Sequence, residues 1–213
     1  MKLSVITIGL SNFLEFTYTV NSCSHKAIKE ILLIVGSNST YLKLLDYYAT
    51  DEKVKIFYLK PSGIYSAMNY GIEKLEFEYS IFMNAGDRFV DDLILPETNI
   101  NSVILFGYRD RGIDHYANKK NFLVLGMPTS HQSIIYPTSI LRNFKYDERF
   151  VFAADFNQLK ELQNNGVKFY FCNNIISEHS KRGSGNHSWT VFKEYRKIIS
   201  SRNVFINLML FLK

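Results

Sequence analysis

The stretch that decides the fold is Lys60–Phe89, KPSGIYSAMNYGIEKLEFEYSIFMNAGDRF. Apolar side chains recur at helical spacing within Tyr65–Leu75, and the short apolar run Tyr79–Met83 follows them. A run of this kind is typical of a strand that is covered on both faces. The sequence Asn84-Ala85-Gly86-Asp87 then interrupts the apolar run. The stretch therefore predicts a loop, an amphipathic helix, a buried strand and a carboxylate at the carboxyl end of that strand.

Strand and helix alternate on both sides of this stretch, which predicts an α/β fold with a mixed, mostly parallel sheet flanked by helices. Ligands of such sheets bind beyond the carboxyl ends of the strands, so Asp87 is expected at the mouth of a site. We expect strands at Leu3–Ile8, Ile31–Val35, Val54–Leu59, Tyr79–Met83, Val103–Phe106, Ser133–Tyr136 and Lys168–Cys172. We expect helices at Phe13–Val20, Tyr41–Ala49, Ile64–Glu76 and Asp155–Asn164, the last closed by Gly166, and polar loops at Glu97–Asn101 and Arg109–Asn121, the second a possible flap.

Composition favours one globular domain, because 213 residues of which 46% are hydrophobic can bury one sizeable core. The net charge of +5 suits an anionic partner, although solvated surface explains such an excess equally simply. Cys23 and Cys172 are isolated and show no metal-ligand spacing. With no signal-peptide pattern and no apolar run of about 18 residues, we expect a cytoplasmic location.

Two common nucleotide-binding motifs are absent from the sequence. There is no Walker A sequence, and no G-x-G-x-x-G follows the first expected strand. Basic residues are dispersed and form no recognised nucleic-acid motif, so no nucleic-acid partner is expected.

The pair SGIYSAMNYGI and FMNAGDRF resembles the donor site of family 2 glycosyltransferases of GT-A fold, the inverting enzymes that build bacterial surface polysaccharides. The likeness extends from Leu3 to about Asn186. It implies a nucleotide-sugar donor, with a UDP-sugar as the first expectation, and a glycan or lipid-linked oligosaccharide acceptor. It also implies a GT-A-like domain over residues 1–187 and a C-terminal tail over residues 188–213.

The resemblance places donor contacts on the first strand-end loops. The family carries acidic residues near Val35, near Ser39 or Thr40, and at Ser62 and Ser66, so this donor pocket is less acidic than is usual. Turn chemistry, helix capping by Ser62, and core packing of Tyr65 and Met68 explain these residues as well. The implied substrate-binding residues in this part of the chain are Thr7, Gly36, Ser37, Ser62, Gly63, Tyr65, Met68, Asn69, Asn84, Ala85 and Gly86.

Asp87 stands where the family has its metal-binding Asp-x-Asp sequence. Departure of a nucleoside diphosphate builds negative charge, and a divalent ion on a carboxylate neutralises it. Oxygen ligands select Mn²⁺ or Mg²⁺, and a single carboxylate would share the ion with the diphosphate and water. The alternative is an ordinary turn at the end of a strand.

Asp155 stands where the family has its catalytic base, after the matching stretch Tyr146–Asp155. Direct displacement at an anomeric carbon needs a group that accepts the proton of the attacking hydroxyl. The dipole of a helix N-terminus would favour an ionised Asp155. The spacing to Gln158 also fits a capping box, and one residue can serve both roles.

The resemblance assigns two further segments to the site. His131 and Gln132 fall on its acceptor side, although a single His near a strand is commonly a packing residue. The stretch Ser177-Glu178-His179 with Gly183-Ser184-Gly185 resembles a loop that closes over the donor, where His179 could be a metal ligand and Lys181 and Arg182 could bind the diphosphate. An exposed polar loop is the alternative.

Beyond Trp189, apolar and basic residues interleave, and Val204–Leu212 is apolar but too short to span a membrane. This pattern predicts either peripheral contact with the inner membrane or packing against the catalytic domain or a second subunit. For the whole chain we expect an inverting glycosyltransferase of surface polysaccharide synthesis. A nucleotide-sugar-binding protein without catalysis is the first alternative, and a nucleotidyltransferase is the second.

Overall fold

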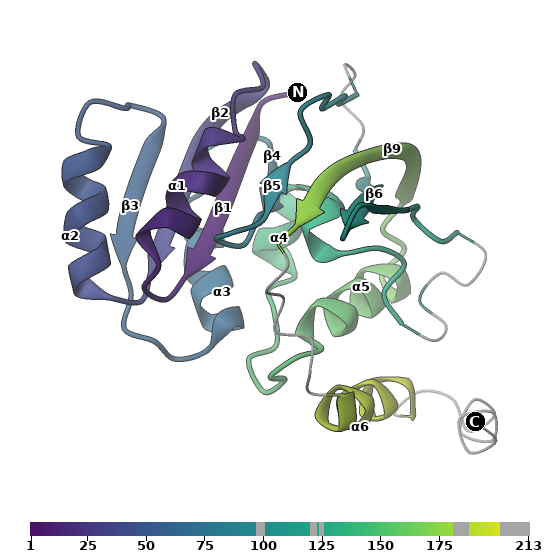
Figure 1. Cartoon of the computed structure of the whole chain (residues 1–213). Helices are drawn as coiled ribbons and strands as arrows, with labels where there is room; N and C mark the ends of the chain where they lie inside the picture. The colour runs from purple at the N-terminus through teal and green to yellow at the C-terminus, as the bar shows by residue number, and fades with distance from the viewer. Residues whose placement is uncertain (97–100, 120–122, 124–125, 181–187, 201–213) are drawn as a thin grey trace.

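A single sheet organises the chain in the computed structural model, which describes residues 1–96, 101–119, 123, 126–180 and 188–200. Its first half consists of four parallel strands in the order β3-β2-β1-β4, joined by helices as the sequence predicts (Figure 1). These elements are β1 (Leu3–Gly9), α1 (Phe13–Asn21), β2 (Ile28–Val35), α2 (Asn38–Tyr47), β3 (Val54–Tyr58), α3 (Ile64–Lys74) and β4 (Tyr79–Phe82).

The second half of the sheet is mixed. After β4 the order continues β8-β6-β9-β5, with β8 antiparallel to both of its neighbours and β9 parallel to β6. The turn after β4 therefore leads into β5, which pairs with β9 at the far end of the strand order. The remaining elements are β5 (Arg88–Phe89), β6 (Val103–Asp110), β7 (Ile113–His115), the 3₁₀ turn η1 (His131–Ser133), β8 (Ile134–Pro137), α4 (Thr138–Asn143), α5 (Ala154–Asn164), β9 (Phe169–His179) and α6 (Ser188–Ser200).

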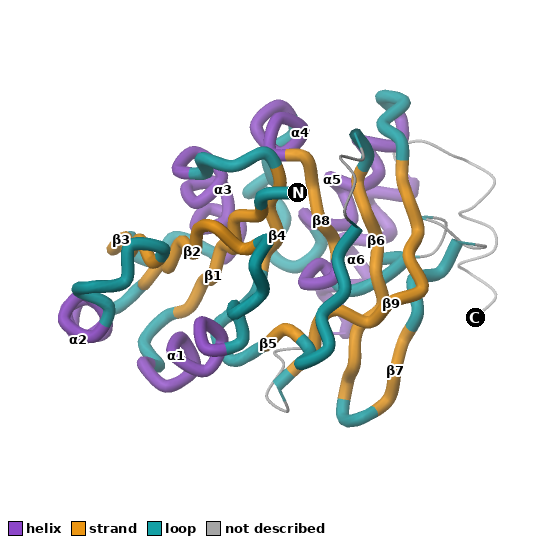
Figure 2. The backbone as a smooth tube through the Cα atoms, turned by 90° about the horizontal axis from the view of Figure 1, so that it is seen from above, coloured by secondary structure: helices purple, strands orange, loops and turns teal. Residues whose placement is uncertain are grey.

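Helices cover both faces of the sheet. Figure 2 shows α1 and α2 on one face and α3, α4 and α5 on the other. Successive residues of a strand point to opposite faces, so Leu3 and Val5 of β1 pack with the α1 layer, whereas Ile6 packs with the α3 layer. This double burial explains why the strands appear in the sequence as continuous apolar runs.

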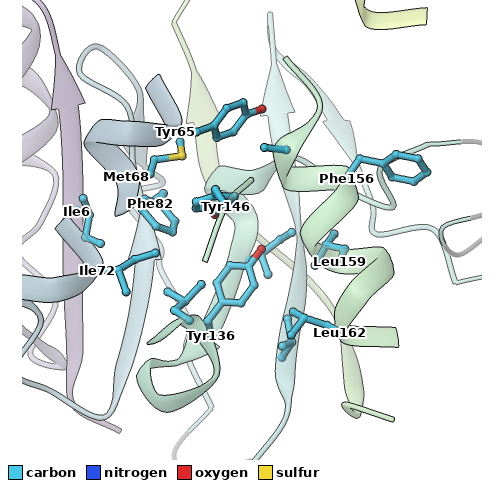
Figure 3. Close-up of a cluster of buried hydrophobic side chains, with 14 of the residues drawn as sticks. Ile6, Tyr65, Met68, Ile72, Phe82, Tyr136, Tyr146, Phe156, Leu159 and Leu162 are labelled. Carbon is cyan, nitrogen blue, oxygen red and sulfur yellow. The ribbon is translucent and has the colours of Figure 1, made fainter. Parts of the chain in front are cut away.

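The core beneath α3 and α5 is rich in aromatic side chains (Figure 3). Tyr146 lies between Tyr65 and Phe82, with ring centroids at 5.4 and 5.5 Å. Burial of a large apolar side chain contributes about 1.5–3 kcal/mol, so these contacts hold α3 firmly against the segment that precedes α5. The aromatic cluster thereby fixes the two elements that carry Tyr65 and Asp155.

The prediction of a polar loop at Arg109–Asn121 is wrong for its first part. Strand β6 continues to Asp110, and β7 returns beside it as a hairpin. Both residues of the connecting turn have positive φ, 51° at Arg111 and 79° at Gly112, which is the geometry of a two-residue hairpin turn. An ion pair of 2.7 Å between Arg109 and Asp114 crosses the strands.

The prediction that Ser177-Glu178-His179 belongs to a flexible loop is also wrong, because these residues form the end of β9. They pair with β6 on one side, and two of them pair with β5 on the other. Lys181, Arg182 and the glycines of that expected loop, and residues 97–100 of the other polar stretch, lie outside the described residues.

Helix α6 packs against the α/β domain. Ile198 and Ile199 are buried in the same cluster as the apolar face of α5, and the Tyr195 ring meets that of Phe156 edge-on at 4.6 Å. The described part of the tail thus follows the packing alternative, while Val204–Leu212 lies outside the described residues. Within the described ranges, no helix has the length and apolar character needed to cross a membrane.

Candidate active site

Three adjoining cavities follow the edge where the parallel strands end. The first, of about 400 Å³, is formed by the loops after β1, β2 and β3 and by the start of α3. Gly36 lines it, and there a Cβ would approach Leu10 Cδ2 and Pro61 Cγ to 3.1 and 3.2 Å. The walls are largely apolar, as suits the flat face of a base, and Ser62, Gly63 and Asn84 also line the cavity.

The second cavity shares those three residues with the first and adds Tyr65, Glu148, His131 and Asp155. The third shares His131 and Asp155 with the second and is lined further by Tyr108, Asp110 and His115. Asp155 and His131 therefore stand where the second and third cavities meet, and Asn84 stands where the first meets the second. A donor and an acceptor could approach each other along this path with Asp155 between them.

Helix α3 begins at the junction of the first two cavities. Its N-cap is Gly63 with φ of 121°, a conformation that glycine alone adopts without strain, and no side chain caps the helix. The Ser62 hydroxyl donates to Ser66 Oγ over 2.9 Å, so capping by Ser62 is wrong. The first N–H groups of an 11-residue helix consequently face the cavities, an arrangement that suits an anion.

Asp155 lies in the first turn of α5, with 15% of its side chain exposed. Its Oδ1 accepts from the Phe156 N–H at 2.8 Å and from the Tyr65 hydroxyl at 3.3 Å. Burial raises the pKa of Asp155 to about 6, more than these hydrogen bonds lower it. A carboxylate of that pKa is ionised at pH 7 and is a better proton acceptor than an ordinary Asp.

The capping box between Asp155 and Gln158 is not formed. Gln158 donates its amide to the Phe144 carbonyl over 2.6 Å, and the N-cap position belongs to Ala153. Asp155 and Gln158 therefore do not form a reciprocal cap. The Asp155 carboxylate instead lies beside Tyr65 and His131, which line the second cavity with it.

His131 lies beside Asp155, with 3.9 Å between His131 Nδ1 and Asp155 Oδ2. Burial, helped by the charge of His179, lowers the pKa of His131 to about 4, so the imidazole is neutral at pH 7. Its Nε2 is buried without a hydrogen-bond partner among the described residues, and the same holds for Asn84 Oδ1. Both residues line the second cavity, and buried polar atoms without partners are expected where a ligand supplies them.

Asp87 is held in a chain of side-chain contacts beside these cavities. Oδ2 accepts from Gln132 Nε2 at 2.7 Å and Oδ1 accepts from the Ser180 N–H at 2.8 Å. Burial raises the pKa of Asp87, against the lowering effect of these donors and of His179. Ser130 extends the network by contacting both Gln132 Oε1 and, at 2.8 Å, His179 Nε2.

The donor set fits a divalent ion only in part. One carboxylate and one imidazole, from Asp87 and His179, lie near each other, and each already has a hydrogen-bond partner. Within the described ranges, no group of three or more His, Cys, Asp or Glu side chains could hold a metal ion. An ion here would need the oxygens of a diphosphate and water for most of its coordination.

The remaining predicted residues divide between the cavity walls and the core. Thr7 and Met68 are buried, at 0% and 1% exposure, and line none of the three cavities. Asn69 bonds to the backbone of Tyr146 on both sides of its amide and thereby fixes the segment ahead of α5. Ser37 is the N-cap residue of α2, and Ala85 packs against the core. Gly86 has φ of 99° in the turn that carries Asp87. Lys181 and Arg182 lie outside the described residues.

The sequence did not identify Thr19 as a residue that supports the site. Its Oγ1 donates to the Asp87 carbonyl at 2.6 Å and the Asn84 carbonyl at 3.2 Å, and accepts from the Gly86 N–H at 3.0 Å. Thr19 thus fixes the turn that presents Asp87. A polar residue on the apolar face of α1 was the available signal, but only the fold shows which turn it meets.

Comparisons with known proteins agree with this architecture. No protein-family model and no curated protein matches the chain. Among solved structures, S. aureus TarS gives a TM-score of 0.69 at 16% identity, over 94% of this chain and 39% of that one. Residues 1–349 of TarS in complex with UDP give 0.68 at 17% identity, over 94% of this chain and 65% of that one.

A third match is the mannosyltransferase PcManGT from Pyrobaculum calidifontis, in complex with GDP-Man and Mn²⁺. It gives a TM-score of 0.65 at 11% identity, over 88% of this chain and 59% of that one. The chain therefore spans between 39% and 65% of the length of these three structures. At these identities the likeness shows the fold, which is the mixed α/β, GT-A-like fold of glycosyltransferase structures.

Proposed function

We propose that the chain is an inverting glycosyltransferase that moves a sugar from a nucleotide-sugar to a glycan acceptor. The observation that carries the proposal is the path of three cavities with Asp155 at its centre, in a fold shared with structures that hold UDP or GDP-Man. Asn84 Oδ1 and His131 Nε2, two of the seven buried side-chain polar atoms that have no hydrogen-bond partner among the described residues, lie on this path and suit the hydroxyl groups of a sugar.

The donor would lie with its nucleoside in the first cavity and its diphosphate near the N-terminus of α3. Apolar walls suit the base, and the uncapped N–H groups after Gly63 suit the phosphates. The sugar would then reach the second cavity, beside Asn84 and His131. A UDP-sugar is our first expectation for the donor. Ser62 and Ser66 stand where the resembled family has acidic residues, so this donor pocket carries less negative charge than is usual in that family.

In the transfer step, the acceptor hydroxyl attacks the anomeric carbon from the face opposite the diphosphate. The new C–O bond forms as the bond to the diphosphate oxygen breaks, and the bonding electrons leave with the nucleoside diphosphate. Asp155 takes the hydroxyl proton as the attack proceeds, which its pKa of about 6 permits at neutral pH. Attack from the opposite face inverts the anomeric configuration.

The neutral His131 would position the acceptor rather than carry charge. At pH 7 one ring nitrogen bears a proton and the other accepts, so the imidazole can bond a sugar hydroxyl in either sense. Tyr65 holds the other side of the Asp155 carboxylate. Both contacts would aim the carboxylate at the acceptor hydroxyl.

Asp87 and His179 would hold a Mn²⁺ or Mg²⁺ ion together with the donor diphosphate. When bound, such an ion neutralises charge that develops on the leaving group. PcManGT is a structure of similar fold in complex with GDP-Man and Mn²⁺. The single carboxylate makes the protein's own affinity for the ion low, so binding of ion and nucleotide should depend on each other.

The acceptor would be a lipid-linked oligosaccharide of surface polysaccharide synthesis, met at the cytoplasmic face of the inner membrane. The outer face of α6 supports this, because Trp189 and Phe192 are exposed there at 66% and 37% and Lys193 lies 5.5 Å from the Trp189 ring. Exposed aromatic residues beside basic ones favour an anionic membrane surface. Flotation with anionic vesicles, comparing the full chain with Trp189→Ala/Phe192→Ala, tests this part; equal flotation would contradict it.

The first experiment is a thermal-shift screen of nucleoside diphosphates and nucleotide-sugars, with and without Mn²⁺, followed by a transfer assay with the stabilising donor. We expect one donor to stabilise the wild type and Asp155→Asn alike, while only the wild type turns it over. Asp46→Asn, an exposed carboxylate on α2, is the matched control and should behave as the wild type. Binding without transfer or donor hydrolysis would favour the non-catalytic nucleotide-sugar-binding protein, and no binding at all would contradict both functions.

A further inference from the structure

Glu194 of α6 accepts hydrogen bonds from three consecutive backbone N–H groups in the turn that leads into α5. Oε1 accepts from Val151 at 2.8 Å, and Oε2 accepts from Phe152 and Ala153 at 2.9 Å each. The carboxylate lies 41 residues from Ala153 in the sequence, so this is a tertiary contact and not a local turn.

The turn has no cap of its own. Ala153 occupies the N-cap position of α5 and has no side-chain oxygen to offer. The N–H groups that Glu194 binds belong to the N-cap residue and to the two residues ahead of it. Buried backbone N–H groups need acceptors, and a carboxylate forms charge-assisted bonds that are stronger than neutral ones. The conformation of residues 151–153 therefore depends on a side chain of α6.

The same turn adjoins the centre of the candidate active site. Val151 and Phe152 line the second cavity, and Asp155 follows Ala153 by two residues. Next to Glu194 on α6, Tyr195 packs its ring against Phe156. Helix α6 thus holds both the approach to Asp155 and the residue immediately after it.

We propose that Glu194 is a positioning residue for Asp155: by binding the N–H groups of residues 151–153 it sets the entry of α5 and hence the direction of the Asp155 carboxylate. The role of Asp155 as the base rests on the proposed function, whereas the hold of Glu194 on the turn does not. This assigns to α6 a part in the site itself, in addition to any contact with a membrane.

Glu194 also acts on Asp155 through its charge. Burial is the main cause of the raised pKa of Asp155, and the negative charge of Glu194 raises that pKa further. Among the described residues, the titratable side chains in contact with or coupled to Asp155 include Tyr65, His131, Tyr136, Tyr146 and Tyr195, which are uncharged at pH 7. The carboxylates of Glu148 and Asp110 line the second and third cavities together with Asp155 and are unchanged in the variants tested below. Removal of the Glu194 charge should therefore lower the pKa of Asp155.

The test uses three variants of the full chain. Glu194→Gln removes the charge and leaves one oxygen as acceptor, and Glu194→Asp keeps the charge but shortens the reach. Glu161→Gln is the matched control, because it removes a carboxylate from α5 whose Oε1 accepts a hydrogen bond from Asn157 on the same helix. Circular dichroism would confirm that each variant folds, and Glu194→Asp keeps the test possible if Glu194→Gln does not.

Two measurements report on the proposal without any substrate. Amide hydrogen exchange at residues 151–153 should accelerate about 10-fold or more in both Glu194 variants, as expected for loss of bonds to a charged group. Titration of the Asp155 carboxyl by ¹³C NMR, assigned with Asp155→Asn, should give a lower pKa in Glu194→Gln and an unchanged pKa in Glu161→Gln. If residues 151–153 of Glu194→Gln exchange their amide hydrogens at the wild-type rate and Asp155 keeps its wild-type pKa, the proposal is overturned.

Once a donor is known, kcat/KM adds a third readout. We expect Glu194→Gln to lose about 10-fold or more in kcat with little change in the affinity for the donor, since misplacement of a catalytic group affects the chemical step. The fall of kcat/KM at acidic pH should begin at a lower pH in Glu194→Gln than in the wild type. If exchange and titration change as expected but the wild type transfers no sugar, the transferase function fails and the hold of Glu194 on the turn stands.

Discussion

The amide of Gln132 donates a hydrogen bond of 2.7 Å to Oδ2 of Asp87, which is 45 residues away in the sequence. This contact joins the turn after β4 to the 3₁₀ turn ahead of β8. His131, the neighbour of Gln132, faces Asp155. Asp87, the candidate metal ligand, and Asp155, the candidate base, are consequently linked through the adjacent residues His131 and Gln132. A shift of either turn should therefore move both carboxylates.

The first prediction concerns Asp87→Asn. The substitution keeps the shape but removes the charge, and it places an amide NH₂ where either the Gln132 amide or the Ser180 N–H donates. We expect the Mn²⁺-dependent part of the thermal shift with nucleoside diphosphate to disappear. We also expect the free energy of unfolding to fall by about 1–3 kcal/mol, because a buried donor loses its acceptor.

Asp46→Asn on the exposed face of α2 is the control for loss of one negative charge. It should retain both the stability of the wild type and its Mn²⁺-dependent shift. A full Mn²⁺-dependent shift in Asp87→Asn would remove Asp87 from the metal site.

The second prediction concerns the pH dependence of transfer. The base must be deprotonated, and burial raises the pKa of Asp155 to about 6. We expect kcat/KM to be level at neutral pH and to fall about tenfold per unit below about pH 6. Asp155→Asn should lose roughly 10²–10⁴-fold in kcat at pH 7.5 while it still binds the donor. A rate that stays level down to pH 4.5 would contradict Asp155 as the base.

The third prediction is that Asp155→Asn is more stable than the wild type at neutral pH. The pKa of Asp155 is about 6 in the folded protein against an ordinary value of 3.8, so between these values the folded state holds a proton that the unfolded state has lost. The contribution of Asp155 to the free energy of unfolding therefore decreases as pH rises through this window, by about 1.4 kcal/mol per unit and at most about 3 kcal/mol in all.

Urea denaturation of both proteins at pH 4 and pH 7.5 measures this difference. Asp87 also has a raised pKa, so the relevant quantity is the wild-type value minus the Asp155→Asn value at each pH. We expect that quantity to become more negative at the higher pH. A difference that does not change with pH would show that Asp155 is not buried as described.

The parallel half of the sheet could be predicted from the sequence because it depends on local patterns, whereas the choice of Asp87 and Asp155 as site residues came mainly from the family resemblance and stays a prediction. Continuous apolar runs mark strands covered on both faces, and the Asn84–Asp87 turn stands directly after one of them. The second half could not be predicted in the same way. The hairpin β6–β7 carries charged residues at its exposed tip, so its pattern resembles a loop, and β9 contains Asn173 and Asn174 in an 11-residue strand.

The contacts that support the site could not be predicted from the sequence, for a different reason. Thr19, Ser130 and Glu194 act on backbone or side-chain groups that only the fold brings to them. The burial of Asp155 was missed too, because a helix start suggested an ionised residue favoured by the dipole, whereas desolvation by the surrounding aromatic side chains proved the larger effect.

The fourth prediction concerns Tyr65→Phe. The Tyr65 hydroxyl donates to Oδ1 of Asp155 at 3.3 Å, a bond that favours the ionised carboxylate and so lowers its pKa. Loss of a hydrogen bond worth about 1 kcal/mol raises the pKa of Asp155 by about 0.7 unit, so kcat/KM should begin to fall at a higher pH and should be about threefold lower at pH 6. Tyr70→Phe on the same helix, where the ring packs against Phe57, is the control and should leave the pH dependence of kcat/KM unchanged. A fall of kcat/KM that begins at a lower pH in Tyr65→Phe than in the wild type would contradict this role.

The fifth prediction concerns Thr19→Val, a nearly isosteric change in a residue that lines none of the described cavities. It removes a buried hydroxyl that binds the carbonyls of Asn84 and Asp87 and the N–H of Gly86, so we expect a loss of about 1–3 kcal/mol in the free energy of unfolding. Because the turn then loses its support, the Mn²⁺-dependent shift with nucleotide should weaken as well. Thr17→Val on the same helix removes only a bond to the Leu14 carbonyl within α1, and it should leave nucleotide binding unchanged. If Thr19→Val and Thr17→Val bind nucleotide equally well, the turn does not depend on Thr19, and the rigidity of the site must come from the contacts of Asp87 with Gln132 and Ser180.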